Sequence, residues 1–378
     1  MIERTGRRMM EDIRPNPLDI AFNVLKIRYA EYDRSIQNSG CQLQPGDRIN
    51  VFINLESAFK NVSMIPDLEN QLMTQRNFEA SIASDILNLA GHYKRFFMGN
   101  QVDTRVYLYH TDFGSDHYNQ LKYNENYRSY FHCKYTQNPR FIYFTDGLIE
   151  KALPLVKTCC EFIPRVYYIS AKNIEGSVVP YVIQQDDLKR NDHRKNFIIG
   201  DDFYETQYGM IPGFLNHYIR RFGVKRPLIS CDNRHILADL LRIPETECDP
   251  VVRHFQTYAM YTTMISCMGD KLRTIDSVSG VGIKTLLKYI SKAESTNRIQ
   301  ENITNPNIIS EIFPDDFRQQ YTDNFYCSSI PSIFEELTDA EKLSLTSQRK
   351  DGIDVQGLME LNQRIFYHHP LILEALCN

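Results

Sequence analysis

The chain has 378 residues, of which 42% are hydrophobic, so it can bury a large core in one large domain or in two closely packed ones. Its formal net charge of −4 excludes a general attraction to nucleic acid, and any such binding has to come from local basic patches. The nine cysteines include no C-x2-C pair, which argues against a zinc ribbon and a disulfide framework and indicates reduced thiols.

Residues 1–46 are predicted to form an N-terminal extension. The segment begins "MIERTGRRMMEDIRPNP", which is charged and lacks the apolar stretch of a signal peptide. No later run approaches the roughly 20 apolar residues that cross a bilayer. We therefore expect a soluble protein that is not exported.

Strand and helix patterns alternate between residues 48 and 203. The apolar, β-branched stretches 48–55, 104–111, 165–171 and 195–203 are typical of buried parallel strands. Helical spacing occurs in 77–97 and 146–162, and 175–185 predicts a short helix that Pro180 interrupts. This alternation predicts an α/β domain over residues 47–245, with a mostly parallel central sheet.

The segment 112–140 is rich in Tyr, Asn, Arg and Lys and poor in aliphatic residues, so we expect it to run over the surface. Its Tyr127, Arg128 and Lys134 combine an aromatic ring with positive charges, which suits stacking on a single nucleic-acid strand. An ordinary tyrosine-rich surface loop explains the same composition equally well.

The pattern becomes helical over residues 246–335, and residues 336–378 are predicted to form a C-terminal helical tail. Within the first of these regions lies "SGVGIKT". Its Gly280 and Gly282 permit close backbone approach or a positive φ, and Ile283, Lys284 and Thr285 open a helix whose first amides suit a phosphate. The stretch fits a helix–three-turn–helix element that binds the DNA backbone, or else a plain connection between two core helices.

Acidic residues follow several of the predicted strands, where ligand sites of parallel sheets lie. They are Asp112, Glu175, Asp201 and Asp202. A cluster of carboxylates can hold Mg²⁺ or Mn²⁺ ions for phosphodiester hydrolysis. Asp and Glu are also common helix caps, and their spacing alone favours this second interpretation.

The stretch "GDKLRTIDSVSGVGIKT" (269–285) resembles the G-D-x-x-D-N-I-P-G-V-x-G-I-G-x-K-T signature of flap endonucleases and of phage or bacterial 5′-3′ exonucleases, a family that includes the ribonuclease H of T-even phages. The shared positions are Gly269, Asp270, Ile275, Val278, Gly280, Gly282, Lys284 and Thr285.

Other segments resemble the family in the same order along the chain. "VFINLESAF" is similar to its first strand, "YRSYFHCKYTQNPR" to its arch region, "NIEGSVVPYVI" to its E-A-D-D-x-I-A helix start and "FIIGDDFYETQY" to its I-I-S-x-D-x-D-F strand end. "FRQQYTDNFYCSSI" resembles the segment that follows the hairpin. The resemblance covers about residues 48–330 and implies a PIN-like nuclease domain with a helix–three-turn–helix region, encoded by a phage or another virus.

The resemblance also implies a metal site, although this sequence lacks some of the acids in the family pattern. Its acids fall on Glu175, Asp201, Asp202 and Asp270, with Asp112 as a helper, and the metal would be Mg²⁺ or Mn²⁺. Asn54 stands where the family has the first-strand Asp, and Arg273 stands at the second Asp of the signature. The acids expected just after Glu175 fall on Ser177 and Val178. Counting one lost acid there, the exchanges add about four positive units, and at an effective dielectric of ~20 one charge at ~4 Å is worth on the order of 4 kcal/mol. Normal two-metal hydrolysis is therefore not expected.

Three hypotheses follow. The first is a protein that binds branched or single-stranded DNA, with nuclease activity weak or lost. The second is an active Mg²⁺-dependent 5′ nuclease of phage DNA replication, cutting a DNA flap or an RNA–DNA hybrid with Glu175, Asp202 and Asp270. The third is a virion or assembly scaffold. The first two place the protein in the cytoplasm of an infected cell, beside phage replication proteins, and the third places it among virion proteins.

Overall fold

The structure is a computed structural model. It describes residues 43–55, 75–99, 101–112, 152–172, 174–200, 202, 204–220, 228–230, 236, 238, 244, 258–269, 276–295, 313–352, 354–367 and 370–377.

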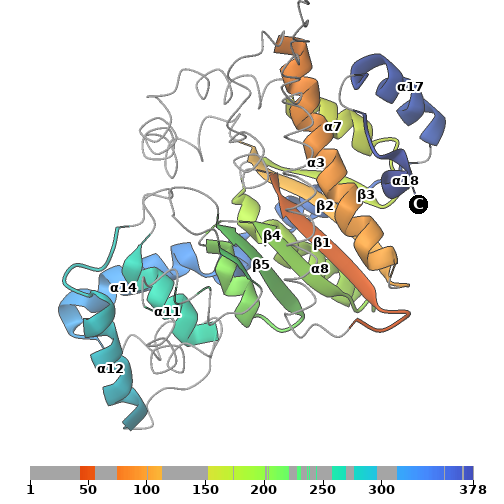
Figure 1. Cartoon of the computed structure of the whole chain (residues 1–378). Helices are drawn as coiled ribbons and strands as arrows, with labels where there is room; N and C mark the ends of the chain where they lie inside the picture. Colours follow the sequence, from red (N-terminus) through yellow and green to blue (C-terminus); the bar gives the residue numbers. More distant parts are fainter. Residues whose placement is uncertain are drawn as a thin grey trace, which may run out of the picture.

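A six-stranded sheet forms the centre of the described chain, with the strand order β3-β2-β1-β4-β5-β6 (Figure 1). Neighbouring strands run parallel from β3 to β5, and only β6 is antiparallel to its neighbour. The predicted α/β fold with a mostly parallel sheet is confirmed. The strands are β1 (Arg48–Asn54), β2 (Asp103–Asp112), β3 (Val166–Lys172), β4 (Lys195–Gly200), β5 (Phe214–Arg220) and β6 (Leu228–Ser230).

Side chains of the central strands alternate between two hydrophobic cores, one on each face of the sheet. In β1, Val51 and Ile53 belong to one core, whereas Phe52 belongs to the other and stacks on Tyr107 of β2 at a ring distance of 4.8 Å. Because both faces are buried, these strands read in the sequence as continuous apolar runs rather than as alternating ones.

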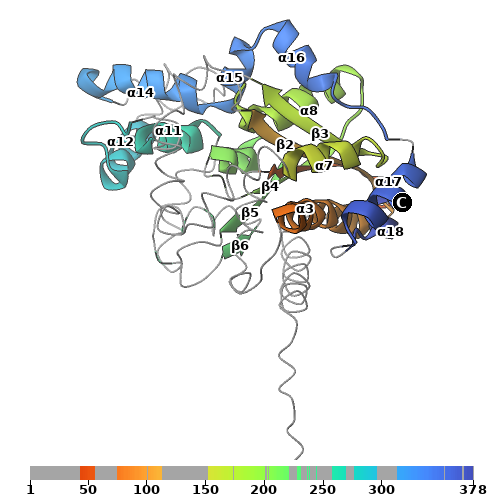
Figure 2. The same cartoon turned by 90° about the horizontal axis from the view of Figure 1, so that it is seen from above.

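Helices cover both faces of the sheet, as Figure 2 shows for α3 and α18 on one side and for α8 and α16 on the other. The first layer contains α3 (Gln75–Met98), α7 (Leu153–Cys160), α17 (Val355–Ile365) and α18 (Leu373–Cys377). The second contains α8 (Val179–Lys189), α15 (Ile330–Glu336), α16 (Asp339–Thr346) and the short 3₁₀ helices η3 (Gly176–Val178) and η4 (Tyr204–Met210).

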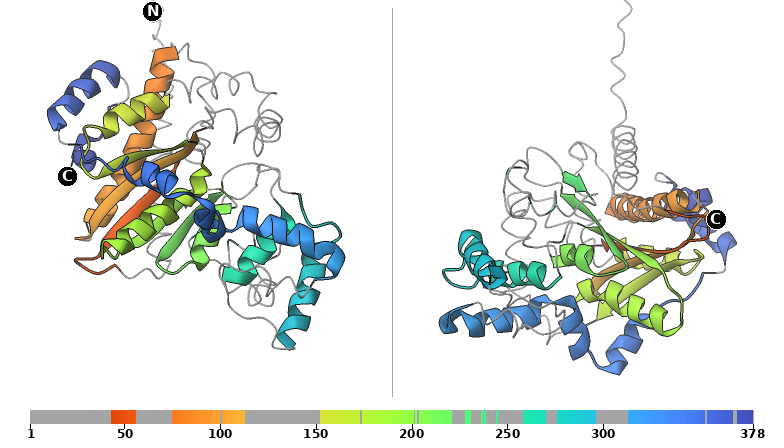
Figure 3. Two further views of the ribbon diagram at one scale, coloured as in Figure 1. Left: turned by 180° about the vertical axis from the view of Figure 1, so that it is seen from behind. Right: turned by 90° about the horizontal axis from the view of Figure 1, so that it is seen from below.

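Three further helices lie beside the sheet, on the side away from α17 and α18 (Figures 1 and 3). They are α11 (Tyr258–Met268), α12 (Ile283–Ser295) and α14 (Asp315–Ser328). Phe313, Tyr321 and Phe325 of this group join the core that also contains Phe52, so the helical group and the sheet share one hydrophobic interior.

One local prediction is wrong. Pro180 does not interrupt a helix, because it lies in the first turn of α8, where its missing N–H would have had no intrahelical partner. The strand predicted to reach residue 203 ends at Gly200 as β4. Strands β5 and β6 were not predicted, since "FLNHYIR" and "LIS" are too short or too polar to stand out.

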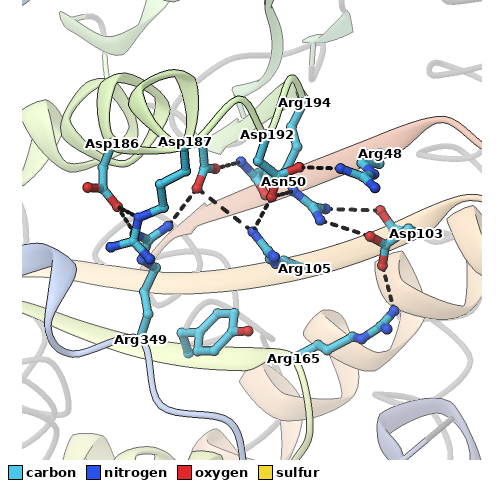
Figure 4. Close-up of polar contacts among 12 residues, drawn as sticks. Arg48, Asn50, Asp103, Arg105, Arg165, Asp186, Asp187, Asp192, Arg194 and Arg349 are labelled. Carbon is cyan, nitrogen blue, oxygen red and sulfur yellow. Dashed lines mark hydrogen bonds and ion pairs between the residues drawn. The ribbon is translucent and has the colours of Figure 1, made fainter.

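The amino end of the sheet carries a network of arginines and acidic residues, shown in Figure 4. Arg194, only 3% exposed, pairs with Asp192 at 2.9 Å and with Asp103 at 2.8 Å, while Arg105 reaches Asp192 at 2.9 Å. We call the following set the amino-end network: Arg48, Asn50, Asp103, Arg105, Arg165, Asp186, Asp187, Asp192, Arg194 and Arg349.

A C-terminal segment, residues 348–352, closes this end of the sheet along its edge strand β3. The Gln348 amide accepts a hydrogen bond from Ser170 N at 2.9 Å and donates one to Ser170 O at 3.1 Å, much as a neighbouring strand would. Arg349 then reaches Asp186 and, at 2.6 Å, Asp187. The side chains of this segment thus satisfy part of an edge that would otherwise be open to pairing with another chain.

No described helix combines the length and the apolar character that a bilayer crossing requires.

Candidate functional site

The described second half of the stretch that carries the family resemblance, residues 276–282, leads into α12, and its Val278 N donates to Cys267 O of α11 at 3.0 Å; we call these residues the hairpin. Val278 and Val281 are buried, and they alternate with exposed Ser279, Gly280 and Gly282. Gly280 has φ +74, a left-handed conformation that glycine adopts without steric cost. The two valines therefore anchor the hairpin in the core, while its small residues face outward.

Side chains of α14 hold the hairpin by its backbone. Asn324 donates to Ser266 O at 2.8 Å and to Asp276 O at 2.7 Å. Gln320 donates to Ser277 O at 3.1 Å and accepts from Ser279 N at 3.3 Å. The contact with Ser266 joins α14 to α11, and the other three involve main-chain atoms of the hairpin, so they fix its shape without covering its exposed side chains.

Helix α12 begins at this exposed turn and carries a row of lysines. Leu286 N donates to Gly282 O at 2.9 Å, so Gly282 is the N-cap residue of α12. Because glycine has no side chain, Gly282 cannot cap the amides that follow it. Lys284, Lys288 and Lys292 are exposed and four residues apart, so they share one helical face. The predicted residues Gly280, Gly282, Ile283, Lys284 and Thr285 are thus brought together, and the row extends them. The sequence interpretation missed Lys288 and Lys292, although their spacing from Lys284 was a usable signal.

At the carboxyl end of the sheet, the predicted metal ligand Glu175 acts as a helix cap. It is 5% exposed, and its Oε1 accepts from Ser177 N at 3.3 Å and from Ser177 Oγ at 3.0 Å. The backbone after it packs tightly on β2, because a Cβ at Gly176 would lie 2.7 Å from Thr111 Oγ1. Glu175 therefore has a structural task at the start of η3.

Asp202 has a similar local task. Its Oδ1 accepts from Tyr204 N at 2.9 Å, at the start of η4. This is the side-chain-to-backbone contact of a local turn that precedes η4. Glu175 thus makes the capping contact that the sequence also allowed, whereas Asp202 stabilises a turn.

Among the described acids at this end, Glu205 is buried most completely, and the sequence interpretation did not single it out. It is 1% exposed, and its Oε1 accepts from Asn54 Nδ2 at 2.8 Å and from Tyr109 OH at 2.6 Å. Burial and the negative charge of Glu205 raise the pKa of Tyr109 well above its usual value, so the phenol stays protonated as a donor.

The two donors are neighbours in the sheet. Asn54 of β1 and Tyr109 of β2 are partners in the parallel register, and both side chains point to the face on which η4 packs. The position that the family resemblance assigns to a metal-binding Asp is therefore filled by an amide that donates a hydrogen bond to a buried carboxylate.

Among the described residues, no three His, Cys, Asp or Glu side chains form a group that could hold a metal ion. Several predicted residues lie outside the described part: Asp201, Asp270, Arg273, Tyr127, Arg128, Lys134 and the side chain of Asp112. Of the described acids at this end, Glu175 caps η3, Asp202 accepts from the backbone at the start of η4, and Glu205 accepts from two neutral donors. The described residues alone do not assemble a metal centre.

The carboxyl end of the sheet is joined to the helical region through η4. Gln207 donates to Ser328 O at 3.0 Å and accepts from Ile330 N at 3.0 Å, between α14 and α15. Tyr204 OH donates to Cys327 O. Helix α14, which holds the hairpin, is therefore fixed to the 3₁₀ helix that contains Glu205.

Comparison with known proteins gives matches among solved structures only. No protein-family model and no curated protein matches the sequence. The chain is similar to a bacteriophage T5 protein co-crystallized with metal ions, at 14% identity and a TM-score of 0.45, covering 80% of this chain and 100% of that one.

Two further matches are of the same kind. The bacteriophage T5 flap endonuclease, as a pseudo-enzyme–product complex with DNA and metal ions, matches at 14% identity and a TM-score of 0.46, covering 79% of this chain and 98% of that one. The zinc-bound T5 5′-exonuclease matches at 15% identity and a TM-score of 0.43, covering 85% and 99%.

Proposed function

We propose that this protein binds branched or single-stranded DNA through the hairpin and the lysine row of α12, and that its nuclease activity is weak or lost. The observation that carries the binding half is the exposed start of α12. There, Gly282 has no side chain to cap the first amides of the helix, and the exposed Lys284, Lys288 and Lys292 share one helical face beside a hairpin whose backbone binds α14. Backbone amides and lysines at a helix start bind phosphate groups without reading base sequence.

The charge of the whole chain makes the local row more important. With a net charge of −4 the protein as a whole repels DNA weakly, so affinity has to come from a concentrated patch. Between residues 276 and 292 the only acidic residue is Asp276, against three lysines. Each lysine that contacts a phosphate releases condensed counterions, which makes binding salt-dependent.

The second half of the proposal is supported by the described acids at the carboxyl end of the sheet. Glu175 and Asp202 accept hydrogen bonds from backbone amides, and Glu205 accepts them from Asn54 and Tyr109. A two-metal phosphodiesterase needs carboxylates whose oxygens face the ions. Acids engaged in this way are suited to holding 3₁₀ helices rather than Mg²⁺ or Mn²⁺.

The binding test uses a labelled 5′-flap DNA, with a single strand and an RNA–DNA hybrid as further substrates, titrated with the full chain over a range of salt concentrations. Charge reversal of Lys284, Lys288 and Lys292 to Glu should weaken binding and lower the slope of log K against log salt by up to about 3, near 0.9 for each lost phosphate contact.

Lys157→Glu is the matched control, because Lys157 is exposed on α7, far along the chain from the hairpin. It should leave both the affinity and the slope close to the wild-type values. If the wild-type chain has no affinity for any of the three substrates at low salt, the proposal fails, and a scaffold role for the same fold gains support.

A further inference from the structure

The buried carboxylate of Glu205 raises a separate question, namely what balances it at the carboxyl end of the sheet. Its two identified donors to Oε1 are an amide and a phenol, at 2.8 Å and 2.6 Å. Both are neutral, and the parallel register of β1 and β2 places them side by side. A buried carboxylate that accepts good hydrogen bonds can stay ionised at low cost.

These donors also decide what else the carboxylate can bind. A carboxylate oxygen offers two lone pairs, and here an N–H and an O–H are both directed at Oε1. Mg²⁺ and Mn²⁺ need oxygen ligands that point lone pairs at the ion. The N–H of Asn54 and the O–H of Tyr109 instead engage the lone pairs of Oε1 that such an ion would use.

We propose that Asn54 and Tyr109 take the place of a divalent cation at Glu205, and that residue 54 is the position that decides between the two arrangements. With Asn54, Glu205 Oε1 receives two hydrogen bonds without a metal ion. With an aspartate there, two carboxylates would share a buried space, and a divalent cation between them would relieve their repulsion.

This inference rests on the part of the proposed function that concerns lost cleavage. Its test uses stability and metal binding alone, so failure of DNA binding by the hairpin would leave it untouched. Conversely, DNA binding can succeed while the exchange at residue 54 gives no metal dependence.

The experiment compares the melting temperatures of the full-length wild type, Asn54→Asp and Asn54→Ala, each in EDTA and in a Mn²⁺ titration. We expect no saturable Mn²⁺ effect on the wild type. Asn54→Asp should melt several degrees lower in EDTA and regain most of that loss, saturably, with Mn²⁺. Asn54→Ala is the control, since it also loses the donor but adds no ligand, and its lower melting temperature should not respond to Mn²⁺.

Two outcomes would overturn the proposal. One is that the melting temperature of Asn54→Asp does not respond to Mn²⁺. This includes a variant that is as stable as the wild type in EDTA and a variant that fails to fold with and without the ion. The other is a saturable Mn²⁺ stabilisation of the wild type that Glu205→Gln abolishes, because that would show a cation already bound at Glu205. If Asn54→Asp folds only when Mn²⁺ is present, the proposal is supported in its strongest form.

Discussion

The two ends of the central sheet hold their buried charges by different means. At the amino end, arginines and aspartates pair directly, as in Arg194 with Asp103 and Asp192. At the carboxyl end, Glu205 is bound by the side chains of Asn54 and Tyr109, which carry no charge. Removing one partner from a buried ion pair leaves an uncompensated charge, whereas removing a neutral donor leaves the carboxylate one hydrogen bond short.

The difference has a structural meaning. The amino-end network fixes the C-terminal segment 348–352 to α8 and β3, so its ion pairs support the shape of the fold. The carboxyl end is where a ligand of a parallel sheet would bind, and there the described acids are engaged in capping and neutral hydrogen bonds. Substitutions at the two ends should therefore differ in size and in their response to pH.

The largest effect is expected for Gly352→Ala at the amino end. A Cβ at this position would lie 2.4 Å from Ile163 N and 2.5 Å from Phe162 C, and neither backbone atom can move aside easily. We expect a loss of about 4 kcal/mol in the free energy of unfolding, measured in urea. Gly282→Ala is the control, because nothing lies within 4 Å of its Cβ position, and it should cost less than about 1 kcal/mol. Similar losses in the two variants would contradict the tight docking of the segment.

The next effect separates buried from exposed members of the amino-end network. Arg349 is 10% exposed and pairs with Asp187, which is 3% exposed, so Arg349→Met should cost about 3 kcal/mol. Arg48 is 54% exposed where it pairs with Asp192, so Arg48→Met should cost under about 1 kcal/mol. Denaturation curves of both variants measure the difference. Equal costs would mean that the network contributes no more in its interior than at its rim.

A pair of neighbouring tyrosines compares the two ends directly. Both Tyr107 and Tyr109 are 0% exposed on β2, but only Tyr109 donates to Glu205, whereas the Tyr107 hydroxyl lies beside Arg349 of the amino-end network without a well-aligned hydrogen bond in the described part of the chain. Tyr109→Phe should lower the free energy of unfolding by about 2 kcal/mol, because it removes a donor from a buried carboxylate. Tyr107→Phe should change it by less than about 0.5 kcal/mol. A larger loss for Tyr107→Phe than for Tyr109→Phe would contradict a stabilising role of the hydrogen bond to Glu205.

The smallest effect concerns a buried lysine near the amino end. Lys94 of α3 donates to Pro164 O at 2.9 Å and to Leu376 O at 2.8 Å, which ties α18 to the sheet. Burial lowers the pKa of Lys94 to about 8, and the nearby groups are Cys377, Arg165 and Asp351.

Because the pKa of Lys94 is lowered in the folded chain, the sign of its effect on stability as the pH changes is fixed. Between pH of about 8 and the unfolded-state pKa near 10.4, the unfolded chain binds more protons at residue 94 than the folded chain, so this side chain adds stability as pH rises. Lys94→Met should therefore lose more stability relative to the wild type at pH near 9 than at pH near 7, by about 1 kcal/mol. Melting curves at both pH values test this, and a pH-independent difference would contradict it.

The sheet was predictable because its strands are buried on both faces. Continuous apolar runs such as "RINVFINL" and "RVYYISA" mark β1 and β3 without any knowledge of their neighbours. Short strands at the far side of the sheet lack this signal, because β5 mixes His217 and Arg220 with apolar residues and β6 has only three residues.

The polar chemistry was less predictable, because it depends on which side chains meet. The family pattern drew attention to the "DD" after β4, whereas Glu205 lies a few residues further on, in a 3₁₀ helix whose direction is fixed by contacts with α14 and α15. The Asn54 exchange was visible in the sequence, but its bond to Glu205 was not. The lysine row of α12 was visible from helical spacing alone.

The most direct test of the central claim, DNA binding with cleavage weak or lost, is a single-turnover assay on a 5′-labelled flap DNA with the protein in excess and Mg²⁺ or Mn²⁺ present. Binding is followed in the same samples by the mobility of the labelled DNA. We predict that the flap is bound through the hairpin and keeps its full length, or is shortened only slightly over long incubation. Rapid shortening that requires the metal ion and disappears in Asp270→Ala would contradict the claim and identify an active 5′ nuclease.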